Sequence, residues 1–252
     1  MVQSVDEDKT MGKLTEEQKK RMIEAGQAVL NMSHGVKNIL QSVRSAEEVM
    51  DLALEKRDLK QAKRTWDILR QNLDRIQKLV LDTLKFSKDE ALNLQPCDLN
   101  RLVESVTETL RPQADQRQIR IDVQTDGHPG QVPMDPEKMR DVVINLLTNA
   151  IEAVEPKTGQ VVVRTELNEH AGQVILRVSD NGCGIEDTGV IFEPFRSTKD
   201  NVGTGLGLAI AQHVVQKHGG TIEAQSPPGE GATFTVRIPC ASKDAKVRRS
   251  EA

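Results

Sequence analysis

The stretch EKMRDVVINLLTNAIEAV, residues 137–154, decides the fold of the second half of the chain. Asp135 and Pro136 precede it and predict a helix start, because aspartate caps free backbone N–H groups and proline fits the first helical position. Two strand-like segments follow, QVVVRTEL (160–167) and QVILRVSD (173–180), joined by a polar turn. A helix followed by a strand pair indicates an α+β arrangement, in which helices pack on a sheet.

The flanking segments extend this pattern in both directions. Pro96 is expected to end the helical region before it, and Asp98 is expected to cap the next helix. Gly219 and Gly220 are expected to stop the last helix. The further elements expected are a helix at 99–114, a strand at 118–124, a helix at 205–219, and strands at 220–226 and 232–239. We therefore predict a two-layer α/β sandwich with an antiparallel-leaning sheet.

The N-terminal part of the chain carries two seams of apolar residues at helical spacing. The first begins at Val29, on a helix that Thr15 is expected to cap, and a polar break at 55–60 separates it from the second. The first seam is Val29, Met32, Val36, Ile39, Val43, Ala46, Met50 and Ala53, and the second is Ala62, Trp66, Leu69, Leu73, Ile76 and Val80. Two helices alone bury little surface, so we expect the hairpin to form a homodimer with a four-helix bundle.

These patterns divide the chain into four segments. They are a disordered N-terminal segment at 1–12, a dimerising helical hairpin at 13–92, an α/β domain at 98–240 and a disordered tail at 241–252. The boundary between the two folded parts is placed where the helical periodicity stops and proline follows.

Composition argues against several classes of partner. The net charge of −4 comes from 34 basic and 38 acidic residues, a mixed surface without the footprint of a nucleic-acid or membrane binder. No apolar run approaches the roughly 20 residues that span a bilayer, and we expect no signal peptide. Three well-separated cysteines, Cys97, Cys183 and Cys240, indicate free thiols and a cytoplasmic protein. His213 and His218 are expected at helix-end or surface positions rather than as metal ligands.

Four short motifs in one order carry the chemistry of the second domain. They are NLLTNAIEA (145–153), DNGCGI (180–185), FEPFRSTK (192–199) and GTGLGLAI (203–210). A single glycine-rich loop is a weak signal, but the four together resemble the nucleotide-binding domain shared by histidine kinases, gyrase-type topoisomerases and heat-shock ATPases. The resemblance covers roughly residues 98–239 and implies that the domain binds ATP and Mg²⁺.

The resemblance assigns roles to residues of the first two motifs. Asn145 and Asn149 lie four residues apart on one helix face, and their amide oxygens suit an Mg²⁺ ion that phosphates also hold. In the ATP-hydrolysing relatives the position of Asn145 is a glutamate that activates water, so asparagine favours transfer to a protein acceptor. Asp180 is expected to accept a hydrogen bond from the adenine amino group, while Gly182 and Gly184 let the backbone approach the ring.

The last two motifs are expected to hold the phosphates. Glycines at a helix start allow backbone N–H groups to cradle phosphate oxygens. Phe192 and Phe195 resemble the hinges of a lid, and Arg196 or Lys199 would reach the terminal phosphate. The residues expected to bind phosphate in these motifs are Lys199, Gly203, Thr204, Gly205, Leu206 and Gly207.

The first helix contains SHGVKNIL (33–40), which resembles the phosphoacceptor box of dimeric sensor histidine kinases in its nitrogen-regulation-like version. With Val29 at heptad position a, His34 falls at position f, away from the seam. Its neutral imidazole has a free lone pair at pH 7 and can attack the γ-phosphorus of ATP. The resemblance implies transfer onward to an aspartate of a response regulator receiver domain. Lys37 and Asn38 complete the catalytic set, and Asn38 would orient a water that dephosphorylates the regulator.

Gly35 departs from the family pattern, which has an acid directly after the histidine. That acid fixes the imidazole tautomer, and general-base help of this kind contributes about 10² to 10⁴ in rate. Two alternatives stay open: a kinase whose orienting group comes from elsewhere, or a weakened one, at the limit a nucleotide-binding pseudokinase that serves as a scaffold for the regulator. An independent gyrase-type ATPase is disfavoured by Asn145 and by the helical hairpin.

Overall fold

The computed structural model describes residues 16–87, 90–125, 130–195 and 205–240, without the side chains of residues 16–32, 34, 86 and 87. The predicted disordered segments at the two ends lie outside these residues. The chain forms two compact units, Met1–Ile76 and Gln77–Ala252. The division at 92–98 expected from the sequence stays a prediction.

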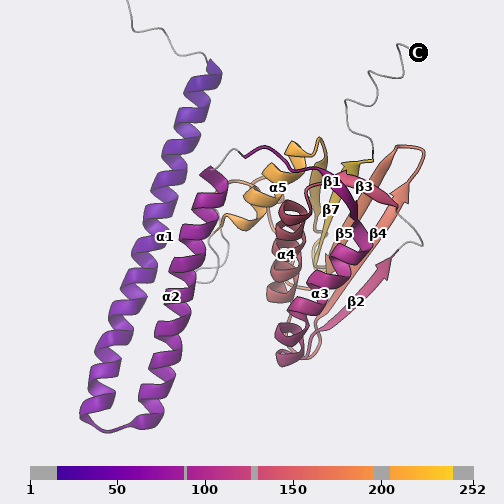
Figure 1. Cartoon of the computed structure of the whole chain (residues 1–252). Coiled ribbons are helices and arrows are strands. Elements are labelled where there is room, and N and C mark those ends of the chain that lie inside the picture. Colours follow the sequence, from indigo (N-terminus) through magenta and orange to yellow (C-terminus); the bar gives the residue numbers. More distant parts are fainter. Residues whose placement is uncertain (1–15, 88–89, 126–129, 196–204, 241–252) are drawn as a thin grey trace, which may run out of the picture. The chain divides into compact units, whose positions relative to one another are not determined.

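The first unit contains most of a helical hairpin, whose second helix continues past Ile76. Helix α1 (Glu16–Glu55) is followed after a tight turn by α2 (Leu59–Ser87), as Figure 1 shows. The turn is closed by the N–H of Asp58, which donates to the carbonyl of Ala53 at 2.8 Å, and by Arg57 with a φ of 54°. The Asp58 carboxylate accepts the N–H of Gln61 and so caps α2. The predicted polar break is therefore the turn of the hairpin, and its cap at Asp58 was not predicted.

The residues that one hairpin buries by itself are only part of the predicted seams. Ala46 and Ala53 of the predicted first seam are buried. On α2 the buried residues are Thr65, Asn72 and Leu79, whereas Trp66 of the predicted seam is 54% exposed. Asn72 donates to the hydroxyl of Ser42 at 3.2 Å and to the carbonyl of Ile68. The packing of the exposed seam against a second copy stays a prediction.

The second unit contains a five-stranded mixed sheet. Its strands are β2 (Arg120–Thr125), β4 (Gln160–Asn168), β5 (Gln173–Asp180), β6 (Thr221–Gln225) and β7 (Ala232–Pro239). Their spatial order is β2-β4-β5-β7-β6, and every neighbouring pair is antiparallel except the parallel pair of β2 and β4. The strands expected from the sequence are thus confirmed.

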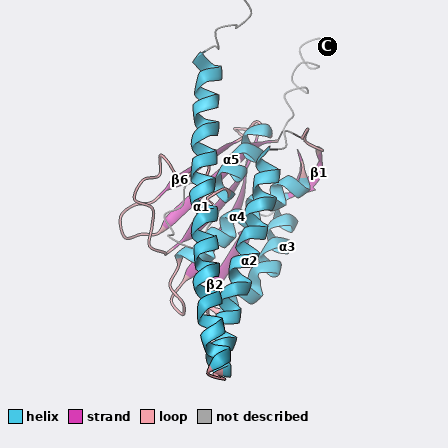
Figure 2. Ribbon diagram, turned by 90° about the vertical axis from the view of Figure 1, so that its left-hand side faces the viewer, coloured by secondary structure: helices cyan, strands magenta, loops and turns pink. Residues whose placement is uncertain are grey.

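Three helices cover one face of this sheet. They are α3 (Leu99–Gln116), α4 (Pro136–Ala153) and α5 (Gly207–Lys217). Figures 1 and 2 show these helices in one layer and the strands in a second layer, which lies to the right of the helices in Figure 1 and behind them in Figure 2. The core between the layers is aliphatic and includes Met139, Leu147, Val163 and Leu176, each at most 1% exposed. The predicted two-layer α/β sandwich is confirmed.

Helix caps predicted from the sequence hold the helices in place. Asp98 accepts the N–H groups of Asn100 and Arg101 at the start of α3. Asp135 caps α4 in the same way, with Pro136 in the first turn. Each cap satisfies backbone donors that a helix start leaves without an internal partner, which explains why both helices begin where the sequence indicates.

A small two-stranded sheet was not predicted. Strand β1 (Gln95–Asp98) pairs antiparallel with β3 (Gln131–Met134), and Pro96 lies opposite Pro133 in the register. Pro96 therefore does not end the preceding helix, because α2 already ends at Ser87. Proline has no N–H for a sheet ladder, but a two-stranded edge tolerates it on the side that faces away from the partner.

Among the helices in the described part of the chain, none is long and apolar enough to cross a membrane.

Candidate nucleotide-binding site

The two asparagines predicted to bind the metal lie on α4. Asn145 and Asn149 are partly exposed, while the opposite face of α4 is buried through Met139, Val142, Val143, Leu146, Leu147, Ala150 and Ile151. The spacing of four residues puts both amides on the accessible face. A Cβ built on Gly207 would lie 3.2 Å from Oδ1 of Asn145, so the start of α5 lies directly against this side chain.

The predicted adenine-binding carboxylate lies at the end of β5. Asp180 is 8% exposed, and its Oδ1 accepts the N–H of Gly182 at 2.9 Å. The loop then passes close to the end of α4: the N–H of Cys183 donates to the carbonyl of Ala153 at 3.3 Å. A Cβ on Gly182 would come within 2.5 Å of that carbonyl oxygen, so only glycine fits there without a backbone shift.

The second half of this loop is held by a residue that the sequence analysis missed. Gly184 has a φ of +77°. Directly after it, the N–H of Ile185 donates to Oγ of Ser226 at 2.7 Å, and the Ser226 hydroxyl donates to the carbonyl of Gly231 at 2.7 Å. Ser226 lies just after β6, ahead of the glycine-containing turn PPGEG. That turn was the available signal, but nothing local connects it to the loop after Asp180.

The start of α5 is shaped by glycine. Gly205 has a φ of +66°, and its carbonyl accepts the N–H of Phe195 at 2.9 Å. The Leu206 side chain is completely buried, so this predicted binding residue offers a ligand only its backbone. Helix α5 begins at Gly207, and the first N–H groups of a helix have no partner within it. These groups, together with the helix dipole, suit an anion such as a phosphate.

A metal ion at this place would depend on amide oxygens. Within the described ranges, no group of three His, Cys, Asp or Glu side chains gathers to bind a metal. The amides of Asn145 and Asn149 are neutral, hard oxygen donors, which fit an Mg²⁺ ion that also takes phosphate and water oxygens. The donor chemistry therefore fits magnesium carried by a nucleotide.

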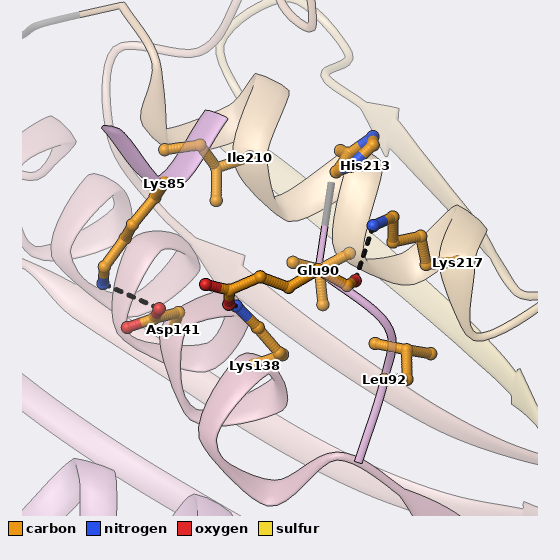
Figure 3. A pocket seen from close by; sticks show the side chains of 9 residues that line it. Lys85, Glu90, Leu92, Lys138, Asp141, Ile210, His213 and Lys217 are labelled. Atoms are coloured by element: carbon orange, nitrogen blue, oxygen red, sulfur yellow. Dashed lines mark hydrogen bonds and ion pairs between the residues drawn. The ribbon is translucent and has the colours of Figure 1, made fainter. Parts of the chain in front are cut away.

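A pocket near the other end of α4 is a separate feature, shown in Figure 3. Its lining residues are Lys85, Glu90, Leu92, Lys138, Asp141, Ile210, His213, Val214 and Lys217. Lys138 pairs with the carboxylate of Glu90 at 2.8 Å, Lys217 donates to the carbonyl of the same residue, and Lys85 pairs with Asp141 at 2.7 Å. Lys138 and Lys217 therefore anchor the segment around Glu90 to α4 and α5, and Lys85 joins the end of α2 to α4.

His218 directly follows the last residue of α5 as its C-cap, in agreement with the helix-end position expected from the sequence. Its Nε2 accepts the N–H of Asp135 at 2.9 Å, and its Nδ1 lies 2.8 Å from the carbonyl of Val214. Accepting at Nε2 requires the proton on Nδ1, which then donates to that carbonyl. His218 thereby joins the end of α5 to the start of α4.

Several predicted site residues lie outside the described part of the chain. They are Arg196, Lys199, Gly203 and Thr204, and also the side chain of His34. Lys37 and Asn38 are exposed on α1. Asn145, Asp180 and the glycines around them are thus the predicted residues for which the structure gives a geometry.

Comparison with known proteins gives the family. Residues 134–242 match the family described as histidine kinase-, DNA gyrase B- and HSP90-like ATPase. A solved structure of the catalytic domain of the histidine kinase ThkA is 30% identical, with a TM-score of 0.54, over 60% of this chain and 100% of that domain. The chain belongs to the histidine kinase family.

Further relatives match most of this chain. The sensor histidine kinase ZraS of Escherichia coli (strain K12) is 30% identical over 88% of this chain and 47% of its own length. The signal transduction histidine-protein kinase AtoS of the same strain is 31% identical over 88% of this chain and 36% of its own length. A structure of ThkA in complex with the response regulator protein TrrA has a TM-score of 0.74 and 25% identity, over 88% of this chain and 64% of that chain. The chain therefore spans about half or less of the curated relatives.

Proposed function

We propose that this kinase transfers the γ-phosphoryl group of ATP to His34 and then to an aspartate of a response regulator receiver domain. The observation that carries the proposal is the meeting of Asn145 with Gly207 at the start of α5, in a chain of the histidine kinase family. An amide oxygen that can ligate a metal, beside the backbone N–H groups at a helix start, suits a nucleotide triphosphate.

The nucleotide would be held at its two ends by different elements. At the base, the Asp180 carboxylate would accept a hydrogen bond from the adenine amino group. The absence of side chains at Gly182 and Gly184 would leave room for the ring. At the phosphates, the N–H groups from Gly205 to Gly207 would donate to oxygens, with Lys199, Gly203 and Thr204 completing the set. This arrangement would orient the triphosphate and hold it away from bulk water.

Magnesium is part of the proposal through Asn145 and Asn149. Bound with the nucleotide, the ion would neutralise phosphate charge. The amides hold it without adding a base, because an amide does not take a proton from water near neutral pH. The pair would therefore support transfer to a side chain rather than hydrolysis.

The acceptor in the proposal is the imidazole of His34. A new N–P bond forms on an imidazole nitrogen while the bond to the bridging oxygen of ADP breaks, and the electron pair leaves with ADP. The phosphoryl group then passes to an aspartate carboxylate of the regulator, which restores the neutral imidazole. Lys37 and Asn38, both exposed on α1, would act on the same face of the regulator, Asn38 by orienting a water that removes the phosphoryl group. The structure of ThkA with TrrA supports a regulator as partner.

A homodimer belongs to the same proposal. The hairpin leaves large apolar side chains exposed: Trp66 and Leu73, seven residues apart on one side of α2, are 54% and 57% exposed. An apolar face of this kind on a two-helix unit suits a second copy that completes a four-helix bundle. The unpaired cysteines Cys97, Cys183 and Cys240 support a cytoplasmic location for the dimer.

Gly35 decides between a full and a weakened kinase. A Cβ built at Gly35 meets no atom within 4 Å, so an acidic side chain would fit at this position. The first candidate is a working kinase whose orienting group comes from another residue. The second is a nucleotide-binding scaffold with little autokinase activity, which only the missing acid favours.

Incubation with γ-labelled ATP and Mg²⁺ tests the proposal. We expect acid-labile, alkali-stable label on the wild type, none on His34→Gln, and unchanged label on His170→Gln, whose histidine is exposed in a turn. Gly35→Glu should label faster if the missing acid limits the rate. Label on Gly35→Glu alone would identify the natural protein as the scaffold. Label that survives in His34→Gln would refute His34 as the acceptor.

A further inference from the structure

We propose that Ser226 is a positioning residue for adenine nucleotides, which sets the orientation of Asp180 through the loop at 180–185. The inference rests on the proposed function, because it assumes that the Asp180 carboxylate accepts a hydrogen bond from the adenine amino group. Ser226 lies beyond the ends of all four sequence motifs, between β6 and β7. Its contacts nevertheless go to the loop that carries the predicted adenine site.

The Ser226 hydroxyl joins two backbone segments that are far apart in sequence. Oγ accepts the N–H of Ile185 at 2.7 Å and donates to the carbonyl of Gly231 at 2.7 Å. A hydroxyl is the smallest side-chain group that both accepts and donates, so it can link an N–H to a carbonyl in one step. A Cβ on Gly184 would come within 3.0 Å of this oxygen, which shows how closely the loop lies on the serine.

Gly231, whose carbonyl accepts the hydrogen bond from Ser226, also lies against the backbone of Asp180. Gly231 crosses so near to Asp180 that a Cβ on this glycine would lie 2.0 Å from the Asp180 carbonyl oxygen. Gly231 has a φ of +77°, a conformation that glycine adopts readily. Asp180 itself pairs with Ala232 in the register of β5 and β7. Ser226 thus fixes the far end of a loop whose near end is the strand carrying Asp180.

Loss of the hydroxyl would free the loop but leave the strands intact. Without it, the N–H of Ile185 and the carbonyl of Gly231 lose a shared partner, while the ladder between β5 and β7 remains. The loop would then sample other positions, and the hydrogen bond from Gly182 to the Asp180 carboxylate would hold that carboxylate less firmly. The expected effect is on recognition of the base, not on phosphoryl transfer once the nucleotide is bound.

The test compares ATP with ITP, in which a carbonyl replaces the adenine amino group. Binding to the full chain with Mg²⁺ is measured by calorimetry for wild type, Ser226→Ala, Ser226→Thr and Thr233→Val. We expect Ser226→Ala to weaken the binding of ATP about 10-fold and the binding of ITP much less. One lost hydrogen bond in such a site changes affinity by up to about that factor. Ser226→Thr, which keeps the hydroxyl, should restore the ATP preference.

Thr233→Val is the matched control. It removes a neighbouring hydroxyl hydrogen bond, from Thr233 to Ser179 at 2.9 Å, without touching the loop, and should leave the ATP preference unchanged. At saturating ATP, Ser226→Ala should label His34 at the wild-type rate. An equal loss of affinity for ATP and ITP would overturn the inference and leave Ser226 with a structural role only. A lower rate of His34 labelling at saturating ATP with unchanged affinity would do the same.

Asp180→Asn separates the two proposals. If Asp180 reads the base, this variant abolishes the preference for ATP over ITP, and the outcome for Ser226→Ala then judges Ser226 alone. If Asp180→Asn keeps the preference, the assigned adenine site is wrong and the role of Ser226 in base recognition is wrong with it. If the alanine variant does not fold, Ser226→Cys, which nearly keeps the volume but weakens both hydrogen bonds, should show the same reduced preference.

Discussion

Oδ1 of Asn145, in the middle of α4, lies against the first residue of α5, where a Cβ built on Gly207 would come within 3.2 Å of it. A contact this tight means that a side chain at Gly207 would press on the amide. The two residues come from different motifs of the sequence, and the fold brings them together at the predicted phosphate end of the nucleotide site.

Replacement of Gly207 by alanine should therefore weaken the binding of Mg-ATP without unfolding the protein. The added methyl displaces the Asn145 amide, and loss of ligand orientation around a metal site typically lowers affinity by about 10-fold. The helix itself should not suffer, since alanine is the better helix former. Calorimetric titration with Mg-ATP and a thermal melt measure the two effects. Gly35→Ala, where the methyl meets no atom within 4 Å, should leave ATP affinity unchanged, and equal effects of the two variants would contradict the prediction.

Arg117 is predicted to stabilise the end of α4. Its guanidinium donates to the carbonyls of Ile151 and Val154, groups that a helix end leaves without an internal partner. Arg117→Met should lower the free energy of unfolding by about 2 kcal/mol, because two carbonyls lose a charged donor. Urea denaturation measures the change. Arg120→Met, at an exposed position on β2, should change stability by less than about 0.5 kcal/mol; a similar loss in both variants would argue against the capping role.

Asp135 is predicted to make stability depend on acid pH. Burial raises the pKa of its carboxyl, but hydrogen bonds from the N–H groups of Asn93, Lys138 and Glu137 together outweigh burial and hold that pKa below its ordinary value of 3.8. The folded state therefore binds the proton more weakly than the unfolded state. The resulting stabilisation is complete well above pH 3.8 and is lost as the pH falls through the lowered pKa.

Asp135→Asn tests this dependence because asparagine keeps an oxygen for the N–H groups of Glu137 and Lys138 but removes the charge, together with the second oxygen that accepts the N–H of Asn93. At pH 7 the free energy of unfolding of the wild type should exceed that of the variant by about 1 kcal/mol. In urea melts taken at successive pH values, this difference should shrink below pH 3.8. Glu155→Gln removes one exposed negative charge after α4 and serves as control. A wild-type advantage that grows on acidification would have the wrong sign and would refute the assignment.

Thr107 is predicted to be a destabilising residue. It is 1% exposed in α3, and its hydroxyl oxygen has no hydrogen-bond partner among the described residues. Thr107→Val removes the buried hydroxyl at nearly constant shape and should raise the free energy of unfolding by about 1 kcal/mol. On the same helix, Thr109 donates to the carbonyl of Ser105 at 2.8 Å and is exposed, so Thr109→Val should bring no gain. Destabilisation by Thr107→Val would imply a partner for the hydroxyl.

The local signals of the sequence were sufficient for most of the sandwich. Asp98 and Asp135 cap the helices that their positions predicted, and the expected strands pair in one sheet. The prediction from apolar spacing did not show which residues a single hairpin buries: Trp66 is exposed on α2 while Asn72 is buried. It also missed the strand at 95–98, because a segment with proline and only four residues carries little strand pattern.

The sequence by itself determined the element types, the caps and the chemical identity of Asn145, Asp180 and the glycines, because periodicity, capping and motif order depend on residues close together in the chain. Only the tertiary structure decided that Ser226 meets Ile185, since their contact joins segments 41 residues apart. Such a contact follows from the order of the strands, which folding sets through long-range packing of the core.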